Sequence, residues 1–477
     1  MEGQVNAYIS TPSKVIKPKG KNISIFRDEA GGYFAKLPNG VVEPIGGGGG
    51  ITDVQISTIT GYVSYTKGND ATAVVGSLVY LFQTIQGALN AGANFVTLVE
   101  SFHQELNPIV LNASTLILDA QLCTFLDLNK IQASPATTGS FVLYGGDFVS
   151  IPNGISFPTE GNLLIECNTI FIANNAGPAL EVSGNTTSNI IINAIEQIFI
   201  QGSEEGILHN SVIGTNNNFK LSCPDGDIVV YSGNNKKAIM LNQSNSPYIS
   251  ARSITFASSN ATAAVHLLNC NTASSDWMSG FISGNIRSGT NAGPLLLIED
   301  FEGRFEIKGS LRQVQSSPSY ALSIVNNTKV AEFTIRDCDL YQNEVLNKVL
   351  NIQFQNQSEC RVLNSSIDGH TEDEIVRVDL SAAGATAVPL VFEGCTIQNR
   401  STGEGIFIKH YVAQNARVQI QDTKIITDAA SDAITSDAAG QEVRILSLYR
   451  TGAINANITN LIAAGIDIQD TDIISGL

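Results

Sequence analysis

The chain has 477 residues, of which 43% are hydrophobic and 15% are charged, and its formal net charge is −17. This apolar fraction excludes an intrinsically disordered chain, and the acidic balance with scattered Lys and Arg argues against nucleic-acid binding, which needs clustered positive charge. The seven cysteines form no Cys-x-x-Cys pair, so the sequence predicts neither a zinc site nor a disulfide framework.

Two further classes are disfavoured. No apolar run approaches the ~18 residues that cross a bilayer, so we expect no membrane insertion. The start, Met1 to Asn6, lacks a basic segment followed by an apolar stretch, so we expect no signal peptide and synthesis in a host cytoplasm. Cys338, Cys360 and Cys395 lie in or beside apolar runs, and we expect them to be buried thiols.

The first residues, 1–45, are expected to form an N-terminal attachment unit. Tyr33 to Ile45 reads as a hairpin, because Asn39-Gly40 supplies the positive φ angles of a tight turn. The basic stretch Lys14 to Lys21 is either an attachment segment or a solvated arm. Gly46–Gly50 follows as a flexible linker that tethers this unit to the rest of the chain.

Residues 51–94 are predicted to form a connector with one short helix. Extended segments and a polar loop, Gly68 to Ala73, come first. An amphipathic helix then follows and stops at Gly92. Its apolar residues at helical spacing are Leu81, Phe82, Ile85, Ala88 and Leu89.

A tandem array occupies residues 95–448. A small residue followed by alternating apolar residues recurs at steps near ~28 residues, a period typical of stacked repeats. Each repeat holds three short alternating segments, for example Ala321–Val325, Val330–Ile335 and Asp339–Tyr341. These segments are too short for helices and suit strands with one buried face.

Three strands per repeat predict an all-β parallel β-helix of about a dozen coils, stacked ~4.8 Å apart. Equivalent residues of successive coils should then lie on one another. The expected inward column is Ile335, Val362, Phe392 and Ile420, and the expected corner column is Asp337, Asn364, Gly394 and Asp422.

The segment that leads into the array resembles a known family of β-helices. The loop Gly68 to Ala73, the segment Phe82-Gln-Thr-Ile-Gln-Gly-Ala-Leu and the strand Val96 to Glu100 resemble the start of pectate-lyase-like right-handed β-helices in phage tailspikes and related virion proteins. The resemblance covers about Gly68 to Leu448. It implies a right-handed parallel β-helix whose short helix caps the first coil, whereas it implies no activity, since this fold hosts lyases, hydrolases and inert fibres.

Residues 449–477 depart from the repeat and are too few to fold alone. They are expected either to seal the last coil as a C-terminal cap or to interleave with copies of themselves in an oligomer; we favour the second.

Candidate chemistry rests on carboxylates along an outer face. Retaining glycosidases hold two carboxyl groups about 5 Å apart and inverting ones about 6.5–9.5 Å. Asp337 and Asp339 lie two residues apart in one coil, and a strand would place both on one face within this range. Asp368 falls in the next coil and Glu393 in the one after. Corner Asp residues also cap turns in any β-helix, so these four stay candidates and no catalytic residue is assigned.

Other polar and aromatic residues give weaker signals. The acidic runs at 299–302 and 372–374 are less favoured candidates, and Arg336 and Arg361 are the nearest basic residues. His209, His266 and His410 are expected to be structural. A glycan-binding surface needs exposed aromatic residues, for which the sequence offers Trp277, Tyr341 and Tyr411.

The preferred hypothesis is a structural virion protein of a bacteriophage: a homotrimeric fibre or spike of tail or head, for host-surface attachment or particle decoration. Its N-terminal region would contact other virion proteins, and a host-surface glycan is a further candidate partner. We expect no cofactor and no metal. A polysaccharide-degrading tailspike and a bacterial surface adhesin are the alternatives.

Overall fold

A computed structural model of the protein describes four short strands before residue 45 and most of the chain from residue 59 to residue 454. The described ranges in this second part are 59–111, 115–133, 139–157, 161–184, 188–211, 217–257, 263–270, 280–288, 293–313, 320–342, 348–380, 390–409, 418–428, 430–436, 443–445, 448–451 and 453–454. The chain divides into two compact units, residues 1–59 and residues 60–477.

The first unit contains one small sheet with the strand order β1 to β4. Its strands are β1 (Tyr8–Ile9), β2 (Ser24–Arg27), β3 (Tyr33–Lys36) and β4 (Val42–Pro44). Strands β3 and β4 are antiparallel, with Lys36 opposite Val42, which confirms the predicted pairing of the two strands. The expected Asn39-Gly40 turn lies outside the described residues. The Gly46–Gly50 linker and the basic stretch Lys14 to Lys21 lie outside the described residues.

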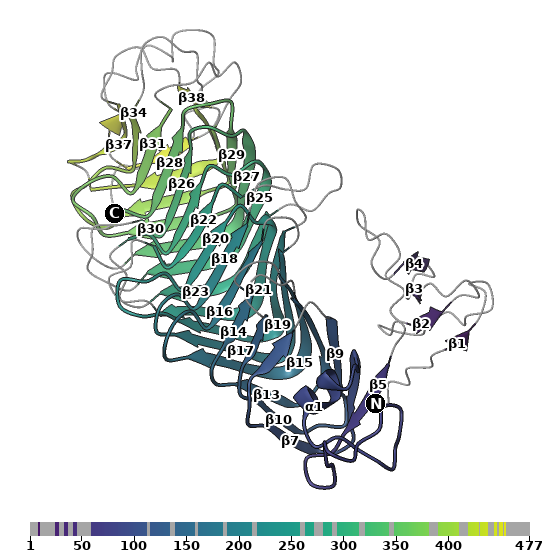
Figure 1. The fold of residues 1–477 in the computed structure, drawn as a ribbon. Helices are drawn as coiled ribbons and strands as arrows, with labels where there is room; N and C mark the ends of the chain where they lie inside the picture. The colour runs from purple at the N-terminus through teal and green to yellow at the C-terminus, as the bar shows by residue number, and fades with distance from the viewer. Residues whose placement is uncertain are drawn as a thin grey trace. The chain divides into compact units, whose positions relative to one another are not determined.

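The second unit is a parallel β-solenoid, in which each turn lies on the turn before it (Figure 1). Within one turn the chain runs along three faces, which we name A, B and C. One such turn contains β29 (Glu359–Leu363) on face A, β30 (Ser366–Gly369) on face B and β31 (Val376–Asp379) on face C. Each strand pairs in parallel with its equivalent in the next turn.

The strands of faces A and B belong to one 22-stranded sheet, and face C is a 14-stranded sheet. Face A contains β5 (Thr60–Val63), β6 (Phe95–Leu98), β9 (Thr115–Ala120), β12 (Gly139–Gly145), β29, β32 (Leu390–Glu393), β35 (Val418–Gln421) and β38 (Val443–Ile445). Face B contains β7 (Phe102–Glu105), β10 (Phe125–Leu128), β13 (Phe148–Ile151), β30, β33 (Thr396–Asn399), β36 (Thr423–Ile426) and β39 (Leu448–Arg450).

In the middle turns, seven long strands bend at the corner and run along both A and B. They are β15 (Gly161–Asn174), β17 (Ser188–Gly202), β19 (Asn218–Tyr231), β21 (Asn245–Ala257), β23 (Gly280–Ser288), β25 (Gly303–Gln313) and β27 (Ala331–Gln342). Face C contains β8 (Ile109–Leu111), β11 (Ile131–Ala133), β14 (Ile155–Phe157), β16 (Leu180–Gly184), β18 (Ile207–Ser211), β20 (Ile239–Asn242), β22 (Val265–Leu268), β24 (Leu296–Glu299), β26 (Leu322–Asn326), β28 (Leu350–Phe354), β31, β34 (Ile406–Lys409), β37 (Asp432–Ser436) and β40 (Ala453–Ile454).

The stack extends beyond the expected range of residues 95–448 at both ends. Strand β5 lies before the helix in the sequence, yet it pairs in parallel with β6 and so adds a strand of face A in front of the first turn, which contains β6, β7 and β8. At the other end, β39 and β40 pair with β36 and β37. The repeat pattern is weak in both short segments, but backbone pairing with a neighbouring turn needs no particular side chain.

The interior confirms the expected stacking of equivalent residues. Ile335 pairs with Val362, Val362 with Phe392, and Phe392 with Ile420. All four side chains are fully buried and belong to one core cluster of the solenoid. The interior is therefore a stack of apolar columns along the solenoid axis.

The corner between faces A and B explains the recurring Asp, Asn and Gly. Asp337, Asn364 and Asp422 have φ values of 51°, 48° and 46°, and Gly394 has a φ of 65°. This left-handed backbone favours Gly and tolerates Asn and Asp. Each of the four residues directly follows the last paired residue of a face A strand, and these strand residues pair with one another from turn to turn. The expected corner column is therefore confirmed.

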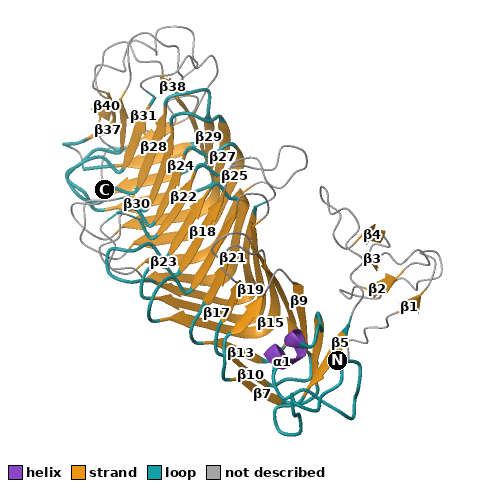
Figure 2. Cartoon of the chain, viewed as in Figure 1, coloured by secondary structure: helices purple, strands orange, loops and turns teal. Residues whose placement is uncertain are grey.

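The helix of the described residues, α1 (Ile85–Asn90), is drawn in purple in Figure 2. Thr84 is its N-cap, and the Thr84 hydroxyl accepts a hydrogen bond from the Gly87 amide at 2.8 Å. The carboxylate of Asp70 accepts hydrogen bonds from the amides of Gln83 and Thr84 at 2.7 and 3.0 Å. This contact gives the polar loop Gly68 to Ala73 a physical role, because it fixes the start of the helix.

Further contacts attach α1 to the first turn. Ile85 and Ala88 are fully buried. The Ile85 amide donates to the buried carboxylate of Glu105 in β7 at 2.7 Å. The side-chain oxygen of Gln86 accepts a hydrogen bond from the Val110 amide in β8 at 2.8 Å.

The interior column predicts a large effect of Phe392→Ala. Because the Phe392 side chain is fully buried between Val362 and Ile420, the cavity should lower the free energy of unfolding by about 3–5 kcal/mol. Arg361→Ala, a change at an exposed position of the adjacent strand, is the control and should change it by less than about 0.5 kcal/mol. Denaturant unfolding of both variants measures the difference; equal losses would contradict the stacked interior.

Candidate functional site

Face B carries two of the four candidate carboxylates. Asp339 lies on β27 and Asp368 on β30 of the following turn. Ser366 is the partner of Asp339 in the register, and Asp368 is the partner of Tyr341. The two carboxylates are therefore one turn and two residues apart on the same outer face.

Each of these carboxylates is held by an arginine of a neighbouring turn. The Arg312 guanidinium is 2.6 Å from the Asp339 carboxylate and lies over the Tyr341 ring, 6.0 Å from its centroid. Arg400 donates to both carboxylate oxygens of Asp368, and its Nε is 2.8 Å from Oδ1. This bidentate contact raises the pKa of Arg400. The pairs join adjacent turns.

The other two candidates lie elsewhere. Asp337 is the corner residue between faces A and B, where the pairing of β25 with β27 shifts by one residue. Glu393 ends β32 on face A and directly precedes the corner residue Gly394. The structure thus places the four candidates on two faces and at a corner, and brings Asp339 and Asp368 together on one face.

The nearby basic residues differ in their contacts. The Arg336 Nε is 2.5 Å from a carboxylate oxygen of Glu306 in the preceding turn. Arg361 is an exposed outward position of β29. Both lie on face A, so neither belongs to the group formed by Asp339 and Asp368 on face B.

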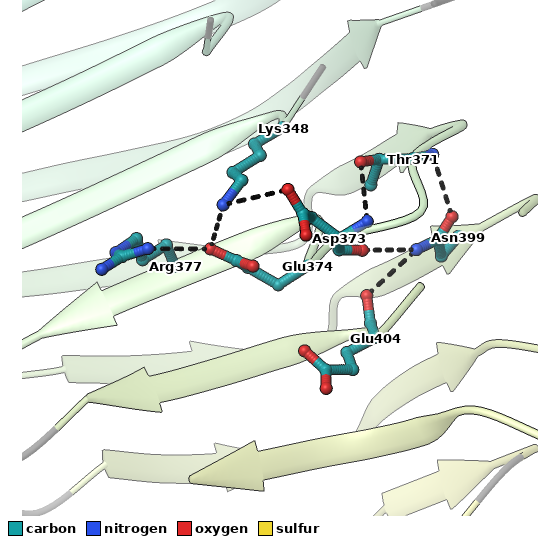
Figure 3. Close-up of polar contacts among 7 residues, drawn as sticks. All are labelled: Lys348, Thr371, Asp373, Glu374, Arg377, Asn399 and Glu404. Atoms are coloured by element: carbon teal, nitrogen blue, oxygen red, sulfur yellow. Dashed lines mark hydrogen bonds and ion pairs between the residues drawn. The ribbon is translucent and has the colours of Figure 1, made fainter. Parts of the chain in front are cut away.

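The acidic run at 372–374 lies in a polar cluster between faces B and C (Figure 3). The carboxylate of Glu374, which is 6% exposed, is 2.6 Å from the Lys348 ammonium and 3.4 Å from the Arg377 guanidinium. The Lys348 ammonium is also 3.6 Å from a carboxylate oxygen of Asp373. Two cations therefore compensate the buried charge of Glu374.

The loop that carries this run is fixed by Asn399. Its side-chain nitrogen donates to the backbone carbonyls of Asp373 and Glu404 at 3.2 and 3.1 Å. Its side-chain oxygen accepts from the Thr371 amide at 3.3 Å. These contacts appear in Figure 3, and they tie one turn to the next at this corner.

Glu404 follows Glu374 at the equivalent position of the next turn, two residues before a paired residue of face C. Burial and the nearby carboxylates of Glu374, Asp432 and Asp373 raise the pKa of Glu404. The cluster therefore contains like charges stacked along the solenoid axis, which is electrostatically unfavourable when all are ionised.

The second acidic run, at 299–302, makes structural contacts. The Glu299 carboxylate is 2.9 Å from the His266 ring. Asp300 is a corner residue with a φ of 52°. Its carboxylate accepts hydrogen bonds from two backbone amides of the next turn, at Asn327 and Thr328, both at 2.9 Å.

His209 lies inside the solenoid, as expected for a structural histidine. The ring is fully buried, with Nδ1 2.6 Å from the Ser244 hydroxyl and Nε2 2.8 Å from the Ser188 carbonyl. Burial lowers the pKa of His209 to about 4. It is therefore neutral at pH 7 and, being enclosed, has no route to a substrate. His410 lies outside the described residues.

All seven cysteines are buried thiols without a disulfide, which confirms the expectation for Cys338, Cys360 and Cys395. Burial raises the pKa of the Cys338 thiol to about 12. Its S–H donates to the Ile307 carbonyl of the preceding turn at 3.2 Å. No group of three or more His, Cys, Asp or Glu side chains within the described ranges has an arrangement that could hold a metal ion.

Aromatic residues on the outer surface of face B escaped the sequence reasoning. Phe102, Phe125 and Phe148 stack with centroid distances of 5.7 and 5.4 Å and nearly parallel rings, and each is at least 36% exposed. Phe171 and Phe199 stack on each other at 5.0 Å in the next two turns, in a second column two residues farther along the strand, where Phe171 pairs with Ser150. The constant spacing of 23 residues between the first three was a usable signal.

Of the three aromatic residues that the sequence suggested for glycan binding, one lies within the described residues. Tyr341 lies on face B beside Asp368, whereas Trp277 and Tyr411 fall outside the described residues. No helix in the described part of the chain is long and apolar enough to cross a membrane.

Comparison of the chain with protein-family models, with curated proteins and with solved structures finds no match.

The raised pKa of Glu404 predicts the effect of Glu404→Gln. A carboxyl whose pKa is raised by folding stabilises the fold below its unfolded pKa of about 4.3, and this contribution is lost as the pH rises through the folded pKa. Glu404→Gln should therefore raise the Tm at pH 7, and the gain should shrink below pH 4. Thermal melts at both pH values measure it, with Glu359→Gln, at an exposed position, as the control. A lower Tm at pH 7 would contradict the assignment.

Proposed function

We propose that this chain is a structural virion protein of a bacteriophage, a homotrimeric fibre or spike attached through its N-terminal region. The observation that carries the proposal is that the outer carboxylates are engaged in ion pairs. Asp339 and Asp368 are bound by arginines that link one turn to another. Such ion pairs suit a surface that holds the stacked turns together. They suit a catalytic surface less well.

The beginning of the solenoid adds support. The loop with Asp70, the helix α1 and the strand β6 correspond to the segments whose sequence resembles phage tailspikes, and Asp70 and Thr84 have defined roles there. We propose that α1 caps the first turn, because an uncovered strand edge invites pairing with other chains. The solenoid is proposed to be right-handed, as in those proteins.

The role of such a protein would be attachment to a host surface or decoration of the particle. The virion is then its location, and other virion proteins are its partners at the N-terminal unit. This function requires no cofactor and no metal.

A second function is kept because of one observation on face B. Asp339 and Asp368 lie in adjacent turns around Tyr341, which is the register partner of Asp368. Two carboxylates beside an aromatic ring are the parts that a glycan hydrolase uses. A polysaccharide-degrading tailspike is therefore the alternative.

Labelling of particles tests the preferred function. Gold-conjugated antibodies against the purified full chain should label phage particles from the lysate of an infected host, at the tail or at the head. Label on uninfected bacterial surfaces would contradict it and favour the adhesin alternative.

Turnover tests the alternative. We expect the full chain to release no oligosaccharides from capsular polysaccharide or lipopolysaccharide of its host, measured as new reducing ends or unsaturated products. If it does release them, Asp339→Asn and Asp368→Asn should each reduce the rate at least about 100-fold when the two carboxylates are the acid and base. Turnover with such losses would contradict the purely structural function.

A further inference from the structure

The outer surface changes character along the solenoid. Apart from Val330, the highly exposed large apolar side chains among the described residues all lie between residues 59 and 231. They are Ile59, Val74, Leu78, Val79, Tyr80, Phe102, Leu106, Leu122, Phe125, Phe148, Ile195 and Tyr231. Apart from the buried His103–Glu105 pair, the ion pairs recorded between described side chains lie between Glu205 and Lys409.

Face A carries an apolar column on its outer side in the early turns. Phe95 pairs with Ile117, Ile117 with Val142, Val142 with Leu164, and Leu164 with Ile191. Their strand neighbours, such as Val96 and Leu118, are fully buried in the interior. Because side chains alternate along a strand, the column points outward.

Face B carries the stacked Phe102, Phe125 and Phe148 and, in the next two turns and two residues farther along the strand, the stacked Phe171 and Phe199. These residues alternate with buried ones such as Leu126 and Val149 and so also point outward. Both columns span the same turns, since β9 with Ile117 and β10 with Phe125 belong to one turn. Two adjacent faces therefore expose apolar columns at the same height.

Contiguous apolar columns on an outer surface indicate a contact that covers them. With strands ~4.8 Å apart and ~3.3 Å per residue, five turns by four residues offer roughly 300 Å² on each face. Each contact buries face A of one copy and face B of the next, roughly 600 Å² in total. A closed ring of three copies contains three such contacts, which together bury roughly 1,800 Å².

The geometry favours a second copy of the chain as the occupant. Rows of side chains spaced by one strand separation are matched by another solenoid with the same rise per turn. A rotation about an axis parallel to the solenoid axis does not shift the copies along that axis. Equivalent turns of the copies therefore lie side by side, and Ile117 of one copy lies beside the turn of the next copy that carries Phe125. A contact of face A with face B is heterologous, and a threefold rotation about such an axis closes it into a ring of three copies.

We propose that the outer apolar columns of faces A and B in the early turns form the contact between copies, with face A of each copy packed on face B of the next. This inference rests on the proposed homotrimer and names its surface. The later turns, with their ion pairs, then remain in contact with solvent.

Charge substitutions in the full chain test this contact. Phe125→Glu on face B or Ile117→Lys on face A should each shift the mass in sedimentation equilibrium at micromolar concentration from three chains of 50.7 kDa toward one. The control is Val330→Glu, at an exposed apolar position outside the columns, which should leave the mass unchanged. Circular dichroism confirms that each variant keeps its β signal.

The double variant Phe125→Glu with Ile117→Lys tests the pairing of the faces. If face A packs on face B, every contact brings a glutamate near a lysine, and the mass should return to three chains. A double variant that stays dissociated would overturn the pairing of A with B.

Two other outcomes separate this inference from the proposed function. If the single variants stay trimeric, the surface is wrong but the proposed trimer stands. If the unchanged chain sediments as one copy at all concentrations, both the contact and the trimer are overturned.

Discussion

Parallel pairing between successive turns is the constraint on which the rest of the structure depends. In the solenoid each residue lies on its equivalent in the turn before, one strand separation away. A residue type that suits one position is therefore repeated along the axis. This produces the buried column of Ile335, Val362, Phe392 and Ile420. It also produces the corner column with left-handed backbone and the arginine–carboxylate pairs between turns.

The same constraint concentrates unfavourable features as well as favourable ones. Glu374 and Glu404 occupy equivalent positions of successive turns, and the structure compensates Glu374 with Lys348 and Arg377. On the outer side of the early turns, repetition builds apolar columns instead. Such a solenoid is suited to association with other copies through the apolar columns of its early turns. The later turns, with their ion pairs, are suited to contact with solvent.

Much of the fold could be predicted from the sequence, since strand alternation and a fixed repeat determine which residues stack. Asp337, Asn364, Gly394 and Asp422 could be aligned as corners because Asp, Asn and Gly share tolerance of left-handed backbone. The first and last strands of the stack could not be predicted from the sequence. Strand β5, for example, pairs through its backbone and carries no repeat signal.

The candidate site was harder to predict than the fold. Spacing two residues apart suggested one face for Asp337 and Asp339, but a residue at the corner does not continue the alternation of the strand. The partners Arg312 and Arg400 come from other turns, at distances in the sequence that depend on loop lengths. The outward phenylalanines were hidden because their residue type is typical of a core, and only their phase within the strand shows that they face outward.

The most direct measurement is a cryo-electron microscopy map of the purified full chain. We expect parallel solenoids in contact through the early turns, with Phe125 of one copy covered by face A of the next and Arg400 in solvent. A single solenoid with Phe102, Phe125 and Phe148 exposed to solvent would contradict this arrangement.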